Sequence, residues 1–275
     1  MTGRERAGSI ALHAGLLAGA VLTLTPLLWM LSASLMPSGQ AMADPPLLLP
    51  HGATLVHYRE LFTHLSLARH LANSALVATA ITALSVVTNS MAGYAFAKFR
   101  FPGRSVLFRL LLLGLVIPTQ AGMLPLFVLM KRLHLVNSYW GVIAPSMATL
   151  FGIFLIRQYI LSIPDAIIDA ARIDGAGEFR IYRSVVLPLA APVLVTLAVF
   201  VFLSAWNDFL WPLIILSDGA KYTLPVALAN LAGEHVQDTE LMMAGAVVTV
   251  VPVLVTFIAL QRYYIRGITM GAVTS

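Results

Sequence analysis

The sequence predicts an all-α polytopic membrane protein with six transmembrane helices and one charged cytoplasmic loop. Only 11% of the 275 residues are charged and 59% are hydrophobic, whereas soluble domains carry about 25% charged residues. Six stretches of at least 21 residues contain no Lys, Arg, Asp or Glu, and a helix needs about 20 apolar residues to cross the hydrocarbon core. Strand-like alternation of polar and apolar residues is absent, so a membrane β-barrel is excluded.

The predicted spans follow these uncharged stretches in order. The first begins after MTGRER, and its apolar run is too long for the core of a signal peptide, so we expect an uncleaved helix. Polar residues on one face of the second span, Thr82, Ser85 and Asn89, predict contact with a neighbouring helix. Prolines in the third to sixth spans predict local irregularities. A single transmembrane domain over residues 1–275 would contain spans at 10–34, 71–97, 107–129, 138–161, 189–215 and 241–261.

Basic residues set the expected orientation. With six spans, 12 of the 17 Lys and Arg residues fall on the side of the two termini and five on the other. Because Lys and Arg favour the cytoplasmic face, both termini and the loop 162–188 are expected in the cytoplasm, with the chain in the inner (cytoplasmic) membrane. This distribution accounts for the net charge of +5, which therefore does not indicate nucleic-acid binding.

Residues 162–188, here named the charged loop, are unusually polar for this chain. Pro164 predicts the start of a helix that runs to about Asp174. Gly175 predicts a C-terminal cap with positive φ. A second short helix is expected over 178–186, ended by Leu187-Pro188. Two short helices joined by a glycine turn would form a compact projection into the cytoplasm.

The first helix of the charged loop is expected to present two different faces. Asp165 and Asp169 share one face, with Arg172 three residues after Asp169. Ile167, Ala170 and Ala171 share the other, and the small Ala pair permits close approach of another surface. Helices that lie on a membrane usually have basic polar faces and bulky apolar ones. An acidic face and an Ala-rich face therefore favour docking to a protein with a basic surface over lying on the membrane.

The stretch DAARIDGAGEFRIYRSVVLP resembles the EAA motif of ABC importer permease subunits: Glu-Ala-Ala, three residues, Gly, nine residues, Ile-x-Leu-Pro. Asp169-Ala170-Ala171, Gly175 and Val185-x-Leu187-Pro188 match it at the same spacing, with Asp for Glu and Val for Ile. NSALVATAITAL, AFAKFRFPGR, SAWNDFLWPLIIL and QRYYIRGITMGAV resemble the carbohydrate-uptake branch, in particular the shorter permease of maltose-type and glycerol-3-phosphate-type systems. The resemblance covers about residues 10–273.

This resemblance implies a transport function. In the family, such a loop is the coupling-helix pair that inserts into a cytoplasmic ABC ATPase, and the importer imports a sugar or polyol by alternating access. It implies four kinds of partner besides membrane lipid: a second permease subunit, an ATPase dimer, an extracytoplasmic solute-binding protein and a small sugar. The docking residues implied are Asp165, Asp169, Ala170, Ala171, Arg172, Gly175, Leu187 and Pro188.

The residues themselves do not indicate an enzyme. A G-x-x-x-x-G-K-[ST] loop is absent, so we expect no ATP hydrolysis, no catalytic residue and no cofactor here, with ATP bound by a partner. The chain has no Cys, and its His residues lack metal-ligand spacing, so no metal site is expected. A secondary transporter is the alternative function, but it needs several ion-coupling carboxylates or broken helices near the midplane, and Asp208 is the one acid that the spans offer. A membrane enzyme needs a cluster of reactive groups, which the spans do not show.

A polar group in the fifth span marks a candidate solute path. Trp206, Asn207 and Asp208 lie together, about 30 Å from the start of that span and hence in its outer half. Aromatic faces and carboxylate or amide oxygens suit sugar rings, so these residues could form a gate or solute contact. A Trp-flanked carboxylate at the membrane interface explains them equally well. Gln120, beside Pro118, is a further candidate.

We predict that single Cys residues at Ser184 and Ser217 label from opposite sides of the membrane. The chain has no Cys of its own, so each variant carries one reporter, and the basic asymmetry places Ser184 inside. A membrane-impermeant maleimide applied to intact cells should label only Ser217→Cys, and both after permeabilisation. Labelling of both variants in intact cells would contradict the six-span orientation.

Overall fold

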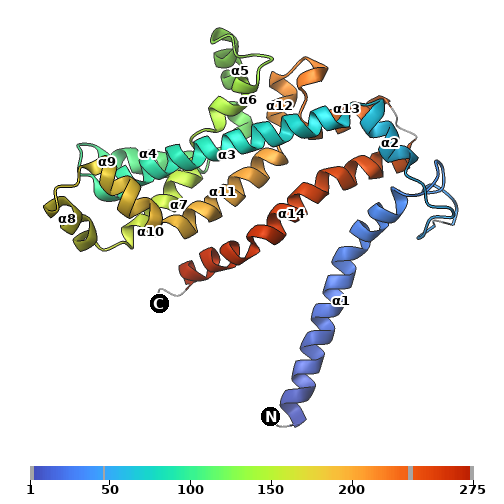
Figure 1. Cartoon of the computed structure of the whole chain (residues 1–275), viewed down its shortest axis with the longest axis horizontal. Helices are drawn as coiled ribbons and strands as arrows, with labels where there is room; N and C mark the ends of the chain where they lie inside the picture. The colour runs from blue at the N-terminus through green and yellow to red at the C-terminus, as the bar shows by residue number, and fades with distance from the viewer. Residues whose placement is uncertain (1–2, 46, 235–237, 273–275) are drawn as a thin grey trace. The chain divides into compact units, whose positions relative to one another are not determined.

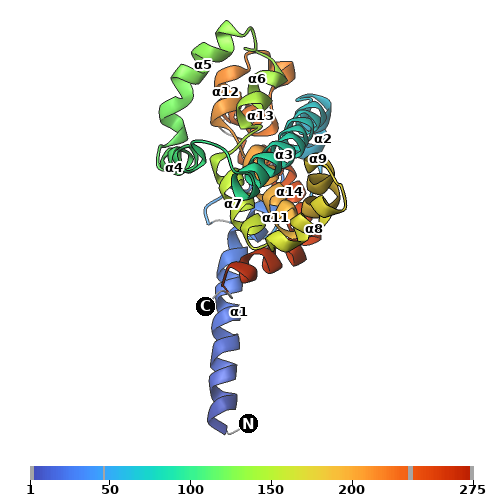
Figure 2. The same cartoon turned by 90° about the vertical axis from the view of Figure 1, so that its left-hand side faces the viewer.

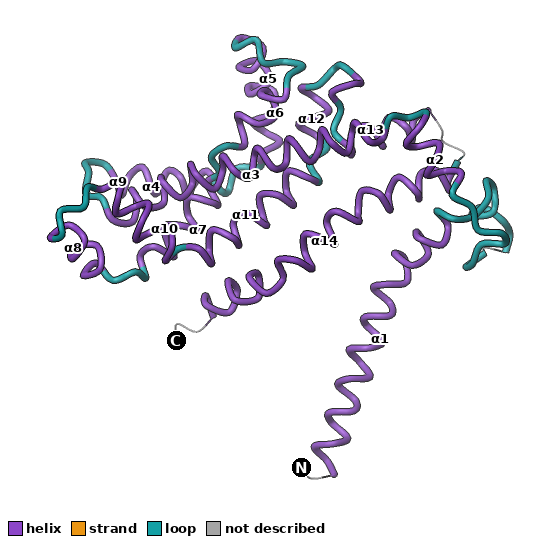
Figure 3. Tube along the Cα trace, viewed as in Figure 1, coloured by secondary structure: helices purple, strands orange, loops and turns teal. Residues whose placement is uncertain are grey.

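A computed structural model describes residues 3–45, 47–234 and 238–272, and within these ranges all regular structure is helical (Figure 3). The predicted all-α class is confirmed. The longer elements are α1 (Gly3–Ala33), α3 (Leu67–Lys98), α4 (Arg104–Gly114), α5 (Met123–Arg132), α7 (Leu150–Leu161), α11 (Ala191–Trp206) and α14 (Thr239–Ala272). The shorter ones are α2 (Val56–Thr63), η1 (Thr119–Gly122), α6 (Tyr139–Ile143), η2 (Ala144–Ser146), α8 (Asp165–Ile173), α9 (Glu178–Ile181), η3 (Tyr182–Val186), α10 (Leu187–Leu189), α12 (Leu210–Ile215), η4 (Gly219–Lys221) and α13 (Leu224–Glu234).

The helices long and apolar enough to cross a membrane number four among the described residues, or up to six if each of two bent helix pairs is one span. The upper count equals the number expected from the sequence. The four are Leu12–Ala33, Leu67–Lys98, Tyr139–Leu161 and Thr239–Ile258. Both α3 and α14 extend beyond their predicted spans.

The third predicted span, 107–129, is not one straight helix. It consists of α4 and, after a turn at residues 115–118, η1 and α5, with a bend of 102° between the two parts (Figure 2). Pro118 directly precedes η1, and a proline both lacks an amide hydrogen and disfavours helical geometry in the residue before it. The irregularity predicted from the prolines of this span is therefore present, and the bend is larger than that of a simple kink.

The fifth predicted span, 189–215, is interrupted twice. Residues 207–209 separate α11 from α12, and Ala190, with ψ of 0°, separates α10 from α11 at a bend of 79°. The helix stop expected at Leu187-Pro188 was therefore wrong by two residues. The helix passes Pro188 because the residues before it form the π-helical η3, in which the Leu187 amide donates to the Tyr182 carbonyl five residues earlier. Pro188 has no amide hydrogen, but the α-helical hydrogen-bond pattern is already interrupted at this point.

Two compact units make up the fold, one of Met1–Ala68 with Ala227–Pro252 and the other of Arg69–Val226 with Val253–Ser275. In the second unit, α3 packs closely on α7. A Cβ added at Gly93 would lie 2.6 Å from a methyl carbon of Ile156, so the missing side chain sets the spacing of the two helices. Arg157 reinforces the contact, since its Nε donates to the Phe96 carbonyl at 3.2 Å.

The predicted polar face of α3 contacts its neighbour. The Asn89 side chain accepts a hydrogen bond from the Thr149 amide at 3.0 Å and donates one to Ser85 Oγ at 2.6 Å. Thr149 is the N-cap of α7, so Asn89 satisfies a backbone donor that the helix cannot satisfy itself. Thr82 instead donates to the Ala78 carbonyl of its own helix. The helix-contact prediction is thus confirmed for Asn89.

The first unit is held together by two buried polar side chains that the sequence did not single out. Glu240, at the start of α14, is fully buried and accepts a hydrogen bond from the Ala41 amide at 2.7 Å. The His57 ring, on α2, donates from Nε2 to the Met36 carbonyl at 2.9 Å. Both bonds anchor the irregular segment 34–45, which follows α1.

Candidate functional site

The charged loop folds as two short helices around a glycine turn, as predicted. Its first helix, α8, begins directly after Pro164 and ends at Ile173. Gly175 has a φ of +79°, a conformation that residues with a Cβ adopt only with strain. Gly177, at φ −69°, has an ordinary backbone. The turn therefore depends on glycine at 175 and not at 177.

Arg172 joins the two helices of the charged loop. Its Nη1 lies 3.0 Å from Asp169 Oδ1 on α8, and its Nε lies 2.9 Å from Glu178 Oε1 at the start of α9. The hydrogen bond from Arg172 to Glu178 is the main reason that the pKa of Arg172 is raised above its ordinary value. Arg172 thus closes the turn around Gly175, and Asp169 already has a basic partner inside this chain.

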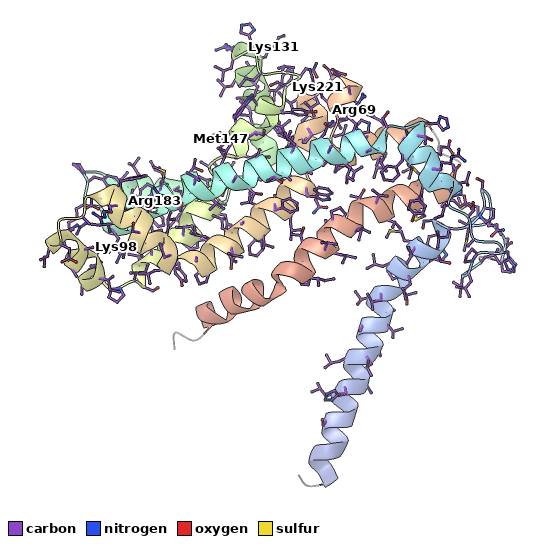
Figure 4. The ribbon with its side chains drawn as sticks, viewed as in Figure 1. Arg69, Lys98, Lys131, Met147, Arg183 and Lys221 are labelled. Carbon is purple, nitrogen blue, oxygen red and sulfur yellow. The ribbon has the colours of Figure 1, made fainter. Side chains whose placement is uncertain are left out.

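Lys98, the last residue of α3, fastens the start of α8. Its side chain is only 7% exposed, and its Nζ donates to the Ile163 carbonyl at 2.6 Å and to Asp165 Oδ1 at 2.5 Å. The hydrogen bond and the charge of Lys98 lower the pKa of the Asp165 carboxyl below its ordinary value. Figure 4 shows Lys98 and Arg183 near one end of the second unit and Arg69 and Lys221 toward the other, with Lys131 at the top of the view. The expected inner and outer positions of these basic residues stay a prediction.

The apolar surface of the charged loop is larger than the predicted face. Ile167 and Ala170, two of the three residues expected on that face, are exposed, while Ala171 is partly buried against the core and Ile168 is buried within it. Two large apolar side chains outside the predicted face are also exposed, Ile173 at 86% and Phe179 at 69%. Docking of this face to a partner stays a prediction. Ile173 and Phe179 flank the predicted glycine turn in the sequence, and this position was the signal that could have predicted their exposure.

The end of the charged loop is continuous with the core. Leu187 packs against the core cluster, whereas Pro188 is exposed.

A hollow of about 640 Å³ lies between the loop and the end of α3. It is lined by charged side chains, among them Lys98, Arg100, Arg104, Asp165, Asp169 and Arg172. Most of these charges face a partner of opposite sign, so the hollow has no strong excess of either.

The candidate solute-path residues lie at the break between α11 and α12. Trp206 is 2% exposed, and its ring stacks on Phe202 with centroids 5.8 Å apart. The indole nitrogen of the buried Trp211 donates to the Gly141 carbonyl at 3.0 Å. In this structure neither indole therefore presents a free face to a sugar or forms a lipid-facing belt.

The remaining candidates are partly accessible. Asp208 is half-buried and accepts a weak hydrogen bond from the Trp211 amide at 3.4 Å, at the start of α12. Asn207 is exposed and donates to the Leu203 carbonyl at 2.8 Å. Gln120 is exposed in η1, on a different element. A contact of these three side chains with solute stays a prediction.

The sequence matches a known protein family over most of this fold. The family described as binding-protein-dependent transport system inner membrane component matches residues 89–270, which include the charged loop and α11. AraQ, the arabinooligosaccharides transport system permease of Halalkalibacterium halodurans, is 40% identical over 257 residues, which are 92% of each chain. NgcG, the diacetylchitobiose uptake system permease of Streptomyces coelicolor, is 32% identical over 94% of this chain and 87% of its own. UgpE, the sn-glycerol-3-phosphate transport system permease of Yersinia pestis, is 32% identical over 98% of each.

A solved structure matches the fold along nearly the whole chain. A bacterial ABC transporter involved in the import of the acidic polysaccharide alginate contains a chain that superposes with a TM-score of 0.84. The match covers 96% of this chain and 99% of that one at 24% sequence identity. At that identity the likeness shows the fold.

We predict that Asp165 titrates below its ordinary pKa of 3.8 and that Lys98→Met raises its titration midpoint. Because the folded pKa is lowered, the ion pair is intact at neutral pH and is lost only as pH falls through that lowered pKa. Carbon-13 NMR of labelled Asp carboxyls in detergent micelles measures the midpoint. Arg100→Gln is the matched control, since Arg100 acts on Asp165 only through its charge. Equal midpoints in the parent and Lys98→Met would show that the ion pair does not form.

Proposed function

Because this chain belongs to the binding-protein-dependent transport system inner membrane component family, we propose that it is the sugar- or polyol-importing permease subunit of an ATP-driven importer, working by alternating access. The observation that carries the proposal is the charged loop. Its motif residues fold as two short helices around a positive-φ Gly175, the shape of an element that inserts into a partner. Membership of a transport-permease family supports the proposal that ATP hydrolysis takes place in a partner subunit.

The chemistry of the solute follows from the relatives. AraQ and NgcG are described as permeases for arabinooligosaccharides and diacetylchitobiose, and UgpE for sn-glycerol-3-phosphate. All three solutes are rich in hydroxyl groups. Asp208 and Asn207, at the break between α11 and α12, carry the oxygen acceptors that such groups need. The solute class therefore extends to this chain as a proposal, with Gln120 as a further contact.

Energy enters through the charged loop. A cytoplasmic ABC ATPase dimer binds and hydrolyses ATP, and this chain needs no cofactor of its own. Ile173 and Phe179 project from the loop and supply apolar area for the ATPase, while Asp169 and Arg172 form its polar edge. Movement of the ATPases displaces the loop, and the spans open alternately to the two sides of the membrane.

The assembly has further members. A second permease subunit completes the pathway, and an extracytoplasmic solute-binding protein delivers the solute. The helices of this chain act as one transmembrane domain in the inner membrane, surrounded by lipid, with both termini in the cytoplasm. The basic side chains at the two ends of the second unit support this orientation. The relatives named above offer no support for a secondary transporter.

We predict that the tagged chain, purified in mild detergent from its native cells, carries an ABC ATPase and a second permease. Mass spectrometry identifies the proteins, and released small molecules are analysed for sugars or polyols. Recovery of the chain alone, in an amount that shows intact insertion, would contradict the proposal. A co-purified solute without hydroxyl groups would contradict only the sugar class.

We predict that Gly175→Val abolishes coupling to the ATPase, whereas Gly177→Val does not. A β-branched residue at φ +79° costs about 1–3 kcal/mol, and the turn must change to relieve it. A Cβ has open space at both positions, so the variants differ only in backbone strain. The measurement is the amount of co-purifying ATPase and its ATP hydrolysis in reconstituted vesicles. Equal behaviour of the two variants would show that the positive-φ turn is not required.

A further inference from the structure

α3 differs from the other spans of its unit. It is a single helix of 32 residues without proline, about 48 Å long at 1.5 Å per residue. By contrast, the described residues between 104 and 206 form two sharply bent helix pairs and a span, Tyr139–Leu161, that is interrupted at residues 147–149. An unbroken helix transmits displacement along its axis because each turn is bonded to the next.

The inner half of α3 is bonded to the charged loop at three points. Ser90, Tyr94 and Lys98 follow one another at intervals of four residues and so lie on one face. The Ser90 hydroxyl lies 2.7 Å from the Tyr182 hydroxyl, and the Tyr94 hydroxyl donates to Glu178 Oε2 at 3.0 Å. Lys98 adds the bonds to the start of α8 described above. The three links reach both helices of the loop.

The outer end of α3 is bonded to a different loop. The His70 ring donates to the Tyr222 carbonyl at 3.1 Å. The side-chain amide of Asn73 (Nδ2) donates to the Ala220 and Tyr222 carbonyls at 3.0 Å each. Ser74 Oγ accepts a hydrogen bond from the Leu224 amide at 2.7 Å. These bonds hold the segment 219–224, which lies in the loop expected on the outer face. One helix therefore connects the ATPase-facing loop to an outer loop.

The α3 side of these links is sheltered. Ser90, Tyr94, Ser74 and the Lys98 side chain are all buried, and Ser90 meets the buried Tyr182. The Glu178 and Asp165 carboxylates, at 46% and 79% exposed, remain accessible to water. The Tyr94 ring also packs between Phe99 and Tyr182, with centroid distances of 5.1 and 5.8 Å. Its hydroxyl can therefore be removed without emptying the site.

We propose that α3 is a strut that transmits movement of the charged loop to the outer segment 219–224, with Ser90, Tyr94 and Lys98 as its inner positioning residues and His70, Asn73 and Ser74 as its outer ones. This inference rests on the proposed function. When the ATPase displaces the loop, the inner bonds carry α3 with it. The outer bonds then displace segment 219–224, so the outer face changes with the state of the nucleotide.

The test uses the purified transporter complex with one reporter, Ala220→Cys, on this Cys-free chain. Ala220 is exposed in η4, and its labelling by a maleimide is followed on this chain with and without ATP and vanadate. We expect the labelling rate of the parent to change about fivefold, the lower end of ordinary allosteric coupling. Tyr94→Phe, which removes one hydroxyl, should reduce that change below about twofold.

Two further variants separate the strut from a general loss of structure. Thr82→Val is the matched control, since it removes an α3 hydroxyl that donates to the Ala78 carbonyl of the same helix, and it should respond like the parent. The double variant Tyr94→Phe/Glu178→Gln should respond no worse than Glu178→Gln alone, because Glu178→Gln already weakens the acceptor of the Tyr94 bond, together with the Arg172–Glu178 ion pair.

The outcomes distinguish the strut from the proposed function. Loss of the response in Tyr94→Phe, with the ATPase still bound in the parent amount, supports the strut. A parent-like response in Tyr94→Phe, or an equal loss in Thr82→Val, overturns it while leaving the proposed function intact. A parent chain that recruits no ATPase contradicts the proposed function, and the strut with it.

Discussion

Hydrocarbon offers no hydrogen bonds, so each polar group in a span of this chain has to find its partner within protein. Asn89 shows how that requirement organises the fold, because it satisfies the Thr149 amide at the start of α7 and thereby fixes α7 against α3. Ser90 and Tyr94 continue the same principle toward the end of α3, where their partners belong to the charged loop. Polar side chains of α3 thus connect the apolar core to the charged loop.

The charged loop also changes how its charges should be understood. In sequence its acidic residues look like a surface prepared for a basic partner. In the structure Asp165 is paired with Lys98, and Asp169 and Glu178 are paired with Arg172. Charges already paired within one chain serve mainly to shape the loop, and a rim pair of this kind adds little affinity of its own. Ile173 and Phe179 are left as the side chains able to bury apolar area against a partner.

The sequence could predict what depends on local composition, and little of what depends on packing. Charge-free runs located the helices, and the spacing around Gly175 predicted a turn whose φ is indeed positive. An irregularity at Pro118 was predictable, but the bend of 102° was not, because the effect of a proline in a membrane helix depends on its neighbours. The surroundings of Trp206 and Trp211 were likewise not predictable. Trp206 stacks on Phe202, which no motif singles out, and Trp211 donates to the carbonyl of Gly141, 70 residues earlier in the chain. The pairing of Lys98 with Asp165 was not predictable either, because the two residues are 67 positions apart and no local pattern connects them.

The close approach at Gly93 restricts the kind of motion available to this part of the protein. Ile156 occupies the place where a side chain on α3 would begin. A slide of four residues, about 6 Å, would bring Asn89 or Ala97 to that place, and both carry a Cβ that the contact has no room for. A ratchet between α3 and α7 is therefore blocked sterically. The two helices can rock together as one body, so alternating access in this region has to be a rotation of paired helices instead of a change of register.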